Sequence, residues 1–301
     1  MGLFRRRSDE GFVLIVVIWF AALLALLAIG FSSAVRANLR AASGAIQGAK
    51  AEALADAGVE LAVLSLMAGA ANRRFAINGS VQSCNMRGLG VVGLRIQDAG
   101  GRVSLNLASD RLLQALFIGL GAGLEDASIL SDLIIDYRDA GDTRLPNGAE
   151  RPEYLAAGRA GGPKNAPFDT VEEVYQVLGA DPALLALAMP HLTVHSQTGG
   201  IDSRGVTREL ATILVRGGDQ LPMTAGAEVA LSAGMPGEFI TSSPQRVFWV
   251  SSEARLANGA AFVREVAVDL QSTQSVPRYM MWKRAPVLGE VTAGGAEVPL
   301  C

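Results

Sequence analysis

The stretch RRRSDEGFVLIVVIWFAALLALLAIGF, residues 5–31, passes from three arginines into an apolar run. The run itself, residues 12–31, has no charge over 20 residues. A helix of that length spans about 30 Å, the thickness of the hydrocarbon core of a bilayer. The arginines precede the run and the next basic residue is Arg36, so the positive-inside rule places the N-terminus in the cytoplasm. The stretch predicts one membrane-spanning helix, with the bulk of the chain in the periplasm if the cell is a bacterium.

A cleaved secretory signal peptide is the first alternative to an anchor. Such a peptide has a shorter apolar core that ends in a small-x-small cleavage site, and FSSAVRA, residues 31–37, offers that spacing. The length of the run favours the anchor, and residues 32–66 contain no proline and continue a helical pattern. Periodicity leaves two possibilities open, namely one helix of more than 50 residues or an anchor followed by a separate juxtamembrane helix.

The rest of the chain alternates between strand-like and helical patterns. Residues 91–96 are strand-like, and the turn signal at 99–101 before Val103 and Leu105 predicts an antiparallel hairpin. Residues 109–192 change to apolar spacing typical of helices. Asn258-Gly259 between two alternating runs predicts another hairpin, and RYMMWKR, residues 278–284, a last strand. The order predicts an α+β fold in which an all-helical domain interrupts a domain with an antiparallel sheet.

Composition and scattered polar residues give little sign of chemistry. The net charge of −3 gives no reason to expect nucleic-acid binding. Cys84 and Cys301 are too few for a metal cluster, and either a disulfide or a free thiol is possible in an oxidising compartment. His191 and His195 flank a predicted strand, which would hold them about 13 Å apart. We interpret them as packing or surface residues, and we find no catalytic constellation.

One acidic loop is conspicuous, because Asp136, Asp139 and Asp142 lie close together in the sequence and Glu150 and Glu153 follow. Calcium requires six to eight oxygen ligands, which a loop of this composition can supply. The spacing does not match an EF-hand, and a solvated acidic loop is the simpler interpretation of the residues alone.

The N-terminus resembles that of type IV pilin-like proteins. In that family a prepilin peptidase cuts on the cytoplasmic side after a glycine, here Gly11, and the new first residue, here Phe12, is commonly methylated. Val16 stands where most members have a glutamate. Its absence resembles one branch, the K subunit of the type II secretion pseudopilins.

Three later motifs are also similar to the K subunit: IIDYRDAGDTRLPNGAERPEY, PKNAPFDTVEEVYQVLG and PHLTV, which lie at residues 134–154, 163–179 and 190–194. The resemblance implies a pilin-like sheet with a helical insert, and calcium bound by Asp139, Asp142 and Glu150. It also implies a non-enzymatic minor pseudopilin at the tip of the pseudopilus, which supports export of folded proteins across the outer membrane. The minor pseudopilins I and J would be its partners, and the inner membrane its location.

These expectations divide the chain into a cytoplasmic leader, a transmembrane helix, a first pilin-like part, a helical insert and a second pilin-like part, at residues 1–11, 12–31, 32–108, 109–192 and 193–301. A minor pilin of a type IV pilus is the main alternative, and it would share the leader but not the insert. A membrane-anchored hydrolase would need a nucleophile and a base, which we do not find in the sequence.

Overall fold

The computed structural model describes residues 9–222, 234–270, 276–288 and 298–301. By its internal contacts the chain divides into two units, Met1–Ala51 and Glu52–Cys301.

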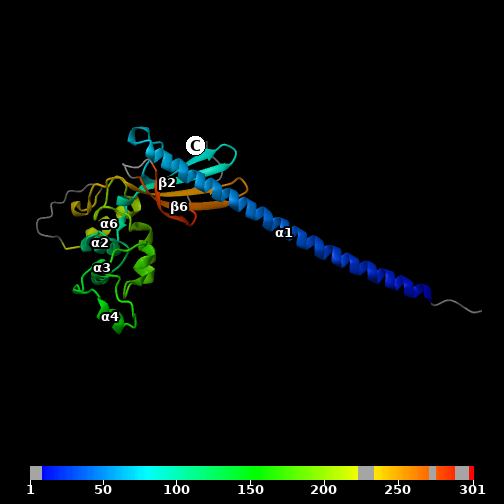
Figure 1. Ribbon diagram of the computed structural model, residues 1–301, viewed down its shortest axis with the longest axis horizontal. Coiled ribbons are helices and arrows are strands. Elements are labelled where there is room, and N and C mark those ends of the chain that lie inside the picture. The colour runs from blue at the N-terminus through cyan, green and yellow to red at the C-terminus, as the bar shows by residue number, and fades with distance from the viewer. Residues whose placement is uncertain (1–8, 223–233, 271–275, 289–297) are drawn as a thin grey trace, which may run out of the picture. The chain divides into compact units, whose positions relative to one another are not determined.

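Helix α1 (Asp9–Met67) runs without interruption through the apolar stretch and beyond it (Figure 1). This confirms one continuous helix over an anchor with a separate juxtamembrane helix. Alanine and leucine, the strongest helix formers, dominate its sequence. The apolar side chains of residues 12–31 are exposed, and the helix is long and apolar enough to cross a membrane by length and composition. These properties support the predicted anchor.

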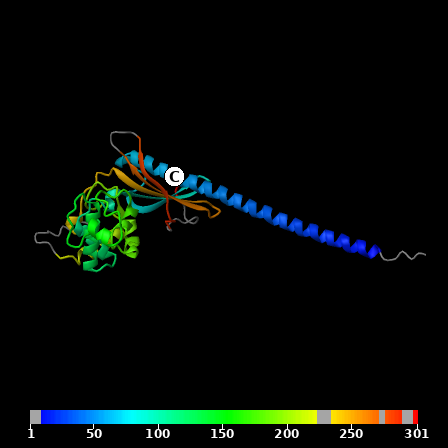
Figure 2. The same ribbon diagram turned by 60° about the horizontal axis from the view of Figure 1, so that its bottom comes forward.

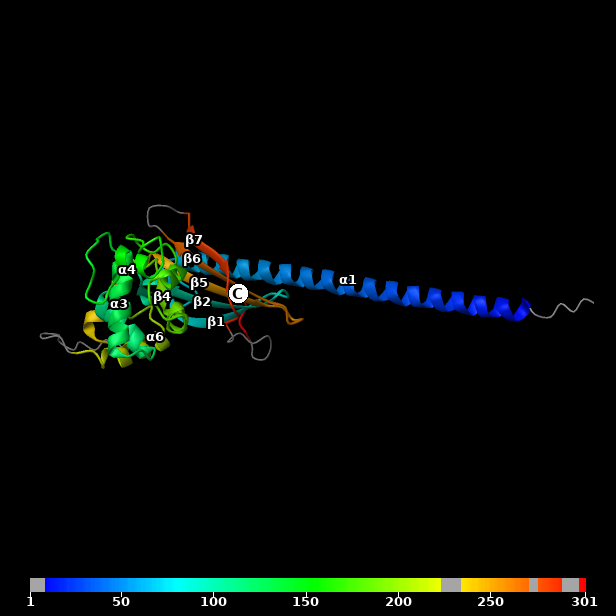
Figure 3. The same ribbon diagram turned by 90° about the horizontal axis from the view of Figure 1, so that it is seen from below.

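A five-stranded antiparallel sheet forms the second principal element, with the strand order β1-β2-β5-β6-β7 (Figure 3). The strands are β1 (Asn78–Met86), β2 (Gly90–Asp98), β5 (Val247–Arg255), β6 (Ala261–Asp269) and β7 (Arg278–Arg284). The hairpin predicted at Asn258-Gly259 is confirmed as β5–β6, with Gly259 at a φ of 87° that favours glycine. The predicted last strand is confirmed as β7.

The prediction of a hairpin between residues 91–96 and residues 103–105 is wrong, because the first segment pairs with a different strand. Strand β2 pairs with β1, which precedes it, and not with residues 103–105. After β2 the Asp98 carboxylate accepts a hydrogen bond from the Gly100 amide at 2.6 Å and begins a 3-10 turn, Ala99–Gly101, which leads the chain away from the sheet. Strand β3 (Val103–Ser104) then pairs in parallel with β4 (Leu192–Thr193). The sequence analysis missed β1 because its sequence, NGSVQSCNM, is largely polar, as is usual for an edge strand.

The helical part is inserted between two neighbouring strands. Strands β2 and β5 pair directly, with Asp98 opposite Phe248, although residues 99–246 separate them in the sequence. This segment holds the helices α2 (Asp110–Gly119), α3 (Leu124–Arg138), α4 (Arg151–Ala156), α5 (Pro182–Ala188) and α6 (Arg208–Gly218), and the 3-10 helices Val171–Gln176, Met189–His191 and Gly237–Phe239 (Figures 1 and 2). The predicted α+β fold with a helical insert is confirmed.

The core of this part extends past residue 192, where the sequence analysis ended the insert. Its buried residues run from Val103 to Phe239 and include Leu210 and Leu214 of α6. A Cβ on Gly217 would lie 1.8 Å from the Ala115 carbonyl oxygen, so α6 approaches the backbone of α2 too closely for a side chain. Helix α6 therefore belongs to the helical core, and the exact domain boundaries stay a prediction.

Helix α1 packs on the sheet through residues 54–66, where Leu54, Ala55, Val59 and Ala62 are buried. Gly58 lies at the closest approach. A Cβ there would lie 2.3 Å from the Ser252 hydroxyl of β5 and 2.6 Å from a methyl group of Val92 in β2. The glycine therefore permits the contact between the helix and the sheet.

Candidate functional site

The acidic loop joins α3 to α4 and is held by two carboxylates of α3. Asp136 is fully buried and accepts a hydrogen bond from the Leu145 amide at 3.1 Å, while Asp132 accepts one from the Asn147 amide at 3.0 Å. A Cβ on Gly148 would lie 1.8 Å from an Asp136 carboxylate oxygen, so only glycine fits there. Because these contacts tie residues 145–148 to α3, this part of the loop is held in place without a ligand.

Glu150 closes the loop with a buried and unpartnered carboxylate. The residue is 4% exposed, and among the described residues neither of its carboxylate oxygens has a hydrogen-bond partner. Burial raises the pKa of Glu150, and the negative charges of Asp136, Asp139 and Asp142 raise the pKa further. A buried anion without a counter-charge is unfavourable, so this place in the fold favours a cation.

Asn165 joins the loop from a segment far along the chain. Its side-chain amide donates to the Asp142 carboxylate and to the Gly141 carbonyl, both at 3.3 Å, and its amide oxygen is buried without a partner. Asp139 accepts a hydrogen bond from the Gly141 amide at 3.0 Å. The sequence analysis missed Asn165, and its only local signal is a residue type that tolerates the positive φ of 50° found here.

The structure therefore brings Asp139, Asp142 and Glu150 to one loop, close enough for both aspartates to act on the pKa of Glu150. Carboxylate and amide oxygens are the ligands that calcium prefers, so the donor chemistry fits. However, the described residues contain no group of three or more Asp, Glu, His or Cys side chains that are placed to hold a metal ion. The loop fits calcium in charge and in donor type, and binding would require its side chains to move together.

The other residues singled out in the sequence have structural surroundings. The Gly11–Phe12 bond lies in the first turns of α1, and the leader residues 1–8 lie outside the described residues. His191 is buried, which lowers its pKa, and the ring of His195 lies 5.9 Å from that of Trp249. Both are packing residues. Cys84 and Cys301 form a disulfide, which decides the alternative that the sequence left open.

The fold is that of a pilin-like protein with an insert. It has a long apolar N-terminal helix, an antiparallel sheet, and a helical domain inserted between β2 and β5. The family model described as type II secretion system, protein K, matches residues 85–197, which contain the acidic loop. Over these residues the chain therefore matches the protein K domain of the type II secretion system. The resemblance in the sequence is thereby confirmed.

A solved structure has the same fold. It is the GspK-GspI-GspJ complex of the type 2 secretion system of enterotoxigenic Escherichia coli. The likeness has a TM-score of 0.54 at 16% identity, and it covers 84% of this chain and 99% of the other. No curated protein matches the sequence significantly.

Proposed function

We propose that the protein is the K minor pseudopilin at the tip of a type II secretion pseudopilus, where it supports export of folded proteins across the outer membrane. The observation that carries the proposal is the helical domain between β2 and β5, which lies largely within the segment matched by the protein K family. The anchor would lie in the inner membrane, with its N-terminus in the cytoplasm and the other domains in the periplasm.

The size of the insert supports a position at the tip. A domain of more than a hundred residues is about 25 Å across, and a subunit with such a domain has difficulty stacking between identical neighbours above and below. Val16 is consistent with this position. It supplies no carboxylate to pair with the N-terminal amine of a subunit ahead, and a subunit at the tip has none ahead of it.

The proposed partners are the minor pseudopilins I and J. Support comes from the solved K-I-J complex, whose fold this chain shares over most of its length. In such a complex the role of the protein is structural and not catalytic.

We also propose that a prepilin peptidase cleaves between Gly11 and Phe12, followed by methylation of Phe12. The support is the arginine-rich leader directly before the exposed apolar run of α1. Mass spectrometry of the protein purified from its own membrane should find a chain that begins at a methylated Phe12. A chain that begins at Arg36 or Ala37 would show removal of an ordinary signal peptide instead.

A further part of the proposal is that the loop at residues 139–150 binds calcium, with Glu150, Asp139 and Asp142 as ligands. The unpartnered buried carboxylate of Glu150 and the unpartnered amide oxygen of Asn165 support it. Bound calcium would supply positive charge that offsets the mutual repulsion of these groups and fixes the loop.

A secretion assay tests the proposed function as a whole. Deletion of the gene should stop release of folded enzymes into the medium while the same enzymes accumulate in the periplasm, and the full-length gene should restore release. The alternative, a minor pilin of a type IV pilus, predicts unchanged secretion together with loss of surface pili or twitching motility.

A further inference from the structure

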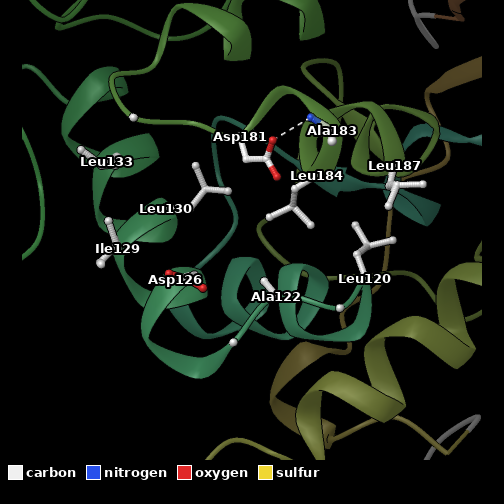
Figure 4. A pocket seen from close by; sticks show the side chains of 13 residues that line it. Leu120, Ala122, Asp126, Ile129, Leu130, Leu133, Asp181, Ala183, Leu184 and Leu187 are labelled. Atoms are coloured by element: carbon white, nitrogen blue, oxygen red, sulfur yellow. Dashed lines mark hydrogen bonds between the residues drawn. The ribbon is translucent and has the colours of Figure 1, made fainter.

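The helical domain has an open groove whose lining includes no residue of the acidic loop. Its volume is about 430 Å³, and it lies between the end of α2, the helix α3 and the helix α5. Figure 4 shows Leu120, Leu130 and Leu184 pointing into the same space. The other apolar side chains in the lining are those of Ala122, Ile129, Leu133, Ala183 and Leu187.

Two carboxylates stand at the edge of this apolar surface. Asp126 lies in the first turn of α3, and Asp181 is the residue that caps α5. Figure 4 shows them on different sides of the groove. The lining contains no lysine, arginine or histidine, and neither aspartate forms an ion pair within the described part of the chain. One oxygen of Asp181 accepts a hydrogen bond from the Ala183 amide at 2.9 Å, which leaves its other oxygen available.

We propose that this groove binds a short helical segment of another protein that presents leucine-like side chains next to lysine or arginine. The apolar floor would accept side chains spaced by one helical turn, as in other complexes that place a helix in a groove. The two carboxylates would pair with basic residues at the sides of that helix and select against an acidic one. This inference depends only on the geometry and charge of the groove, and not on the secretion role.

Both aspartates lie at helix starts, where a carboxylate is favourable without any ligand. The chain offers a matched control for this effect. Glu125 lies in the same first turn of α3 as Asp126 but does not line the groove. Asparagine also caps helices well, so Asp181→Asn removes the charge of Asp181 and preserves its cap.

The experiment uses the full chain in nanodiscs of zwitterionic lipid, with labelled methyl groups observed by NMR. Three synthetic helical peptides serve as probes. They share one leucine pattern, and their polar positions carry lysine, glutamine or glutamate. Empty nanodiscs measure binding of each peptide to the lipid. We expect the lysine peptide to shift the methyl signals of Ile129, Leu130 and Leu184 at the lowest concentration, and the glutamate peptide to shift them least.

Variants test the role of the lining. Because an exposed ion pair is worth up to about 1 kcal/mol, Asp126→Asn and Asp181→Asn should each weaken binding of the lysine peptide by about two- to fivefold, while Glu125→Gln leaves it unchanged. Leu187→Ser should also weaken binding, whereas Leu155→Ser, a similarly exposed leucine outside the groove, should not.

Three results would overturn the proposal. They are equal shifts with the lysine and glutamate peptides, methyl shifts confined to residues outside the groove, and methyl shifts that depend on protein concentration without any peptide. The last would show that a second copy of the chain occupies the groove.

Discussion

At the scale of single residues, the buried carboxylate of Glu150 links pH to stability. Its pKa is raised in the folded protein above the ordinary value of 4.5, so the folded state holds this proton more tightly than the unfolded state. Below the ordinary pKa both states are protonated and the residue has no effect. As the pH rises through the window between the two pKa values, the free energy of unfolding falls, and the loss is complete above the folded pKa.

We therefore expect Glu150→Gln to stabilise the calcium-free protein at neutral pH, by about 1–3 kcal/mol for removal of an unpaired buried charge. The gain should shrink as the pH falls toward 4.5 and disappear well below that value, where the wild-type side chain is neutral in both states. Thermal unfolding of both proteins in chelator across this pH range measures the difference. A variant less stable than the wild type at neutral pH would show that Glu150 has a counter-charge without calcium.

In calcium, the wild type should become more stable than Glu150→Gln, because only the wild type keeps all three proposed ligands. A ligand that binds only the folded state stabilises it by about 2.7 kcal/mol at 100 times its dissociation constant. The melting temperature of the wild type should thus rise in millimolar calcium, and the variant Asp139→Ala/Asp142→Ala should lose the response. The matched variant Glu125→Ala/Asp126→Ala removes two acids from the same domain and should respond as the wild type does. Identical melting of the wild type in calcium and in chelator would exclude the site.

In the candidate site, the sequence singled out Asp139, Asp142 and Glu150 because they match family motifs, and their role as ligands stays a prediction. It could not predict that Asp136 serves as a backbone acceptor for the Leu145 amide. It also did not single out Asn165 within the motif at residues 163–179, because Asn165 meets Asp142 only in the folded chain. Such contacts depend on tertiary structure and leave no local pattern.

At the scale of elements, the contact of α1 with the sheet depends on Gly58. Alanine is about 1 kcal/mol better than glycine in a helix, but the added methyl group would lie 2.3 Å from the Ser252 hydroxyl. Overpacking of this kind costs about 1–3 kcal/mol. We expect Gly58→Ala to lower the free energy of unfolding, measured with denaturant and tryptophan fluorescence.

Gly44→Ala is the matched control in the same helix, because a Cβ there would meet no atom within 4 Å. It should leave stability unchanged or raise it by up to about 1 kcal/mol. If both variants were stabilised alike, α1 would not pack on the sheet at Gly58.

The elements that the sequence predicted well carry strong local signals. The apolar run of α1 and the Asn258-Gly259 turn between β5 and β6 belong to this group. Strand β1 was missed because, of its residues, only Cys84 is buried, so no alternation of apolar residues marks it. The partner of β2 was wrong because the turn at Ala99–Gly101 looks the same in sequence whether the chain returns to the sheet or leaves it.

At the scale of the whole molecule, the decisive feature is an insertion that the sequence shows only as a change of pattern. The pairing of Asp98 with Phe248 defines it, and no local rule predicts contact across residues 99–246. The same holds for the disulfide between Cys84 and Cys301, which are 217 positions apart. The resemblance to protein K predicted the order of the domains, whereas the inclusion of α6 in the helical core follows from its packing on α2.

The central claim is that this chain is a K minor pseudopilin, and its assembly tests that claim most directly. The full chain would be produced together with the I and J pseudopilins of the same cell, purified through a tag on this chain, and weighed by native mass spectrometry. We expect a complex with one copy of each protein. Purification of this chain without I and J, or with the minor pilins of a type IV pilus in their place, would contradict the claim.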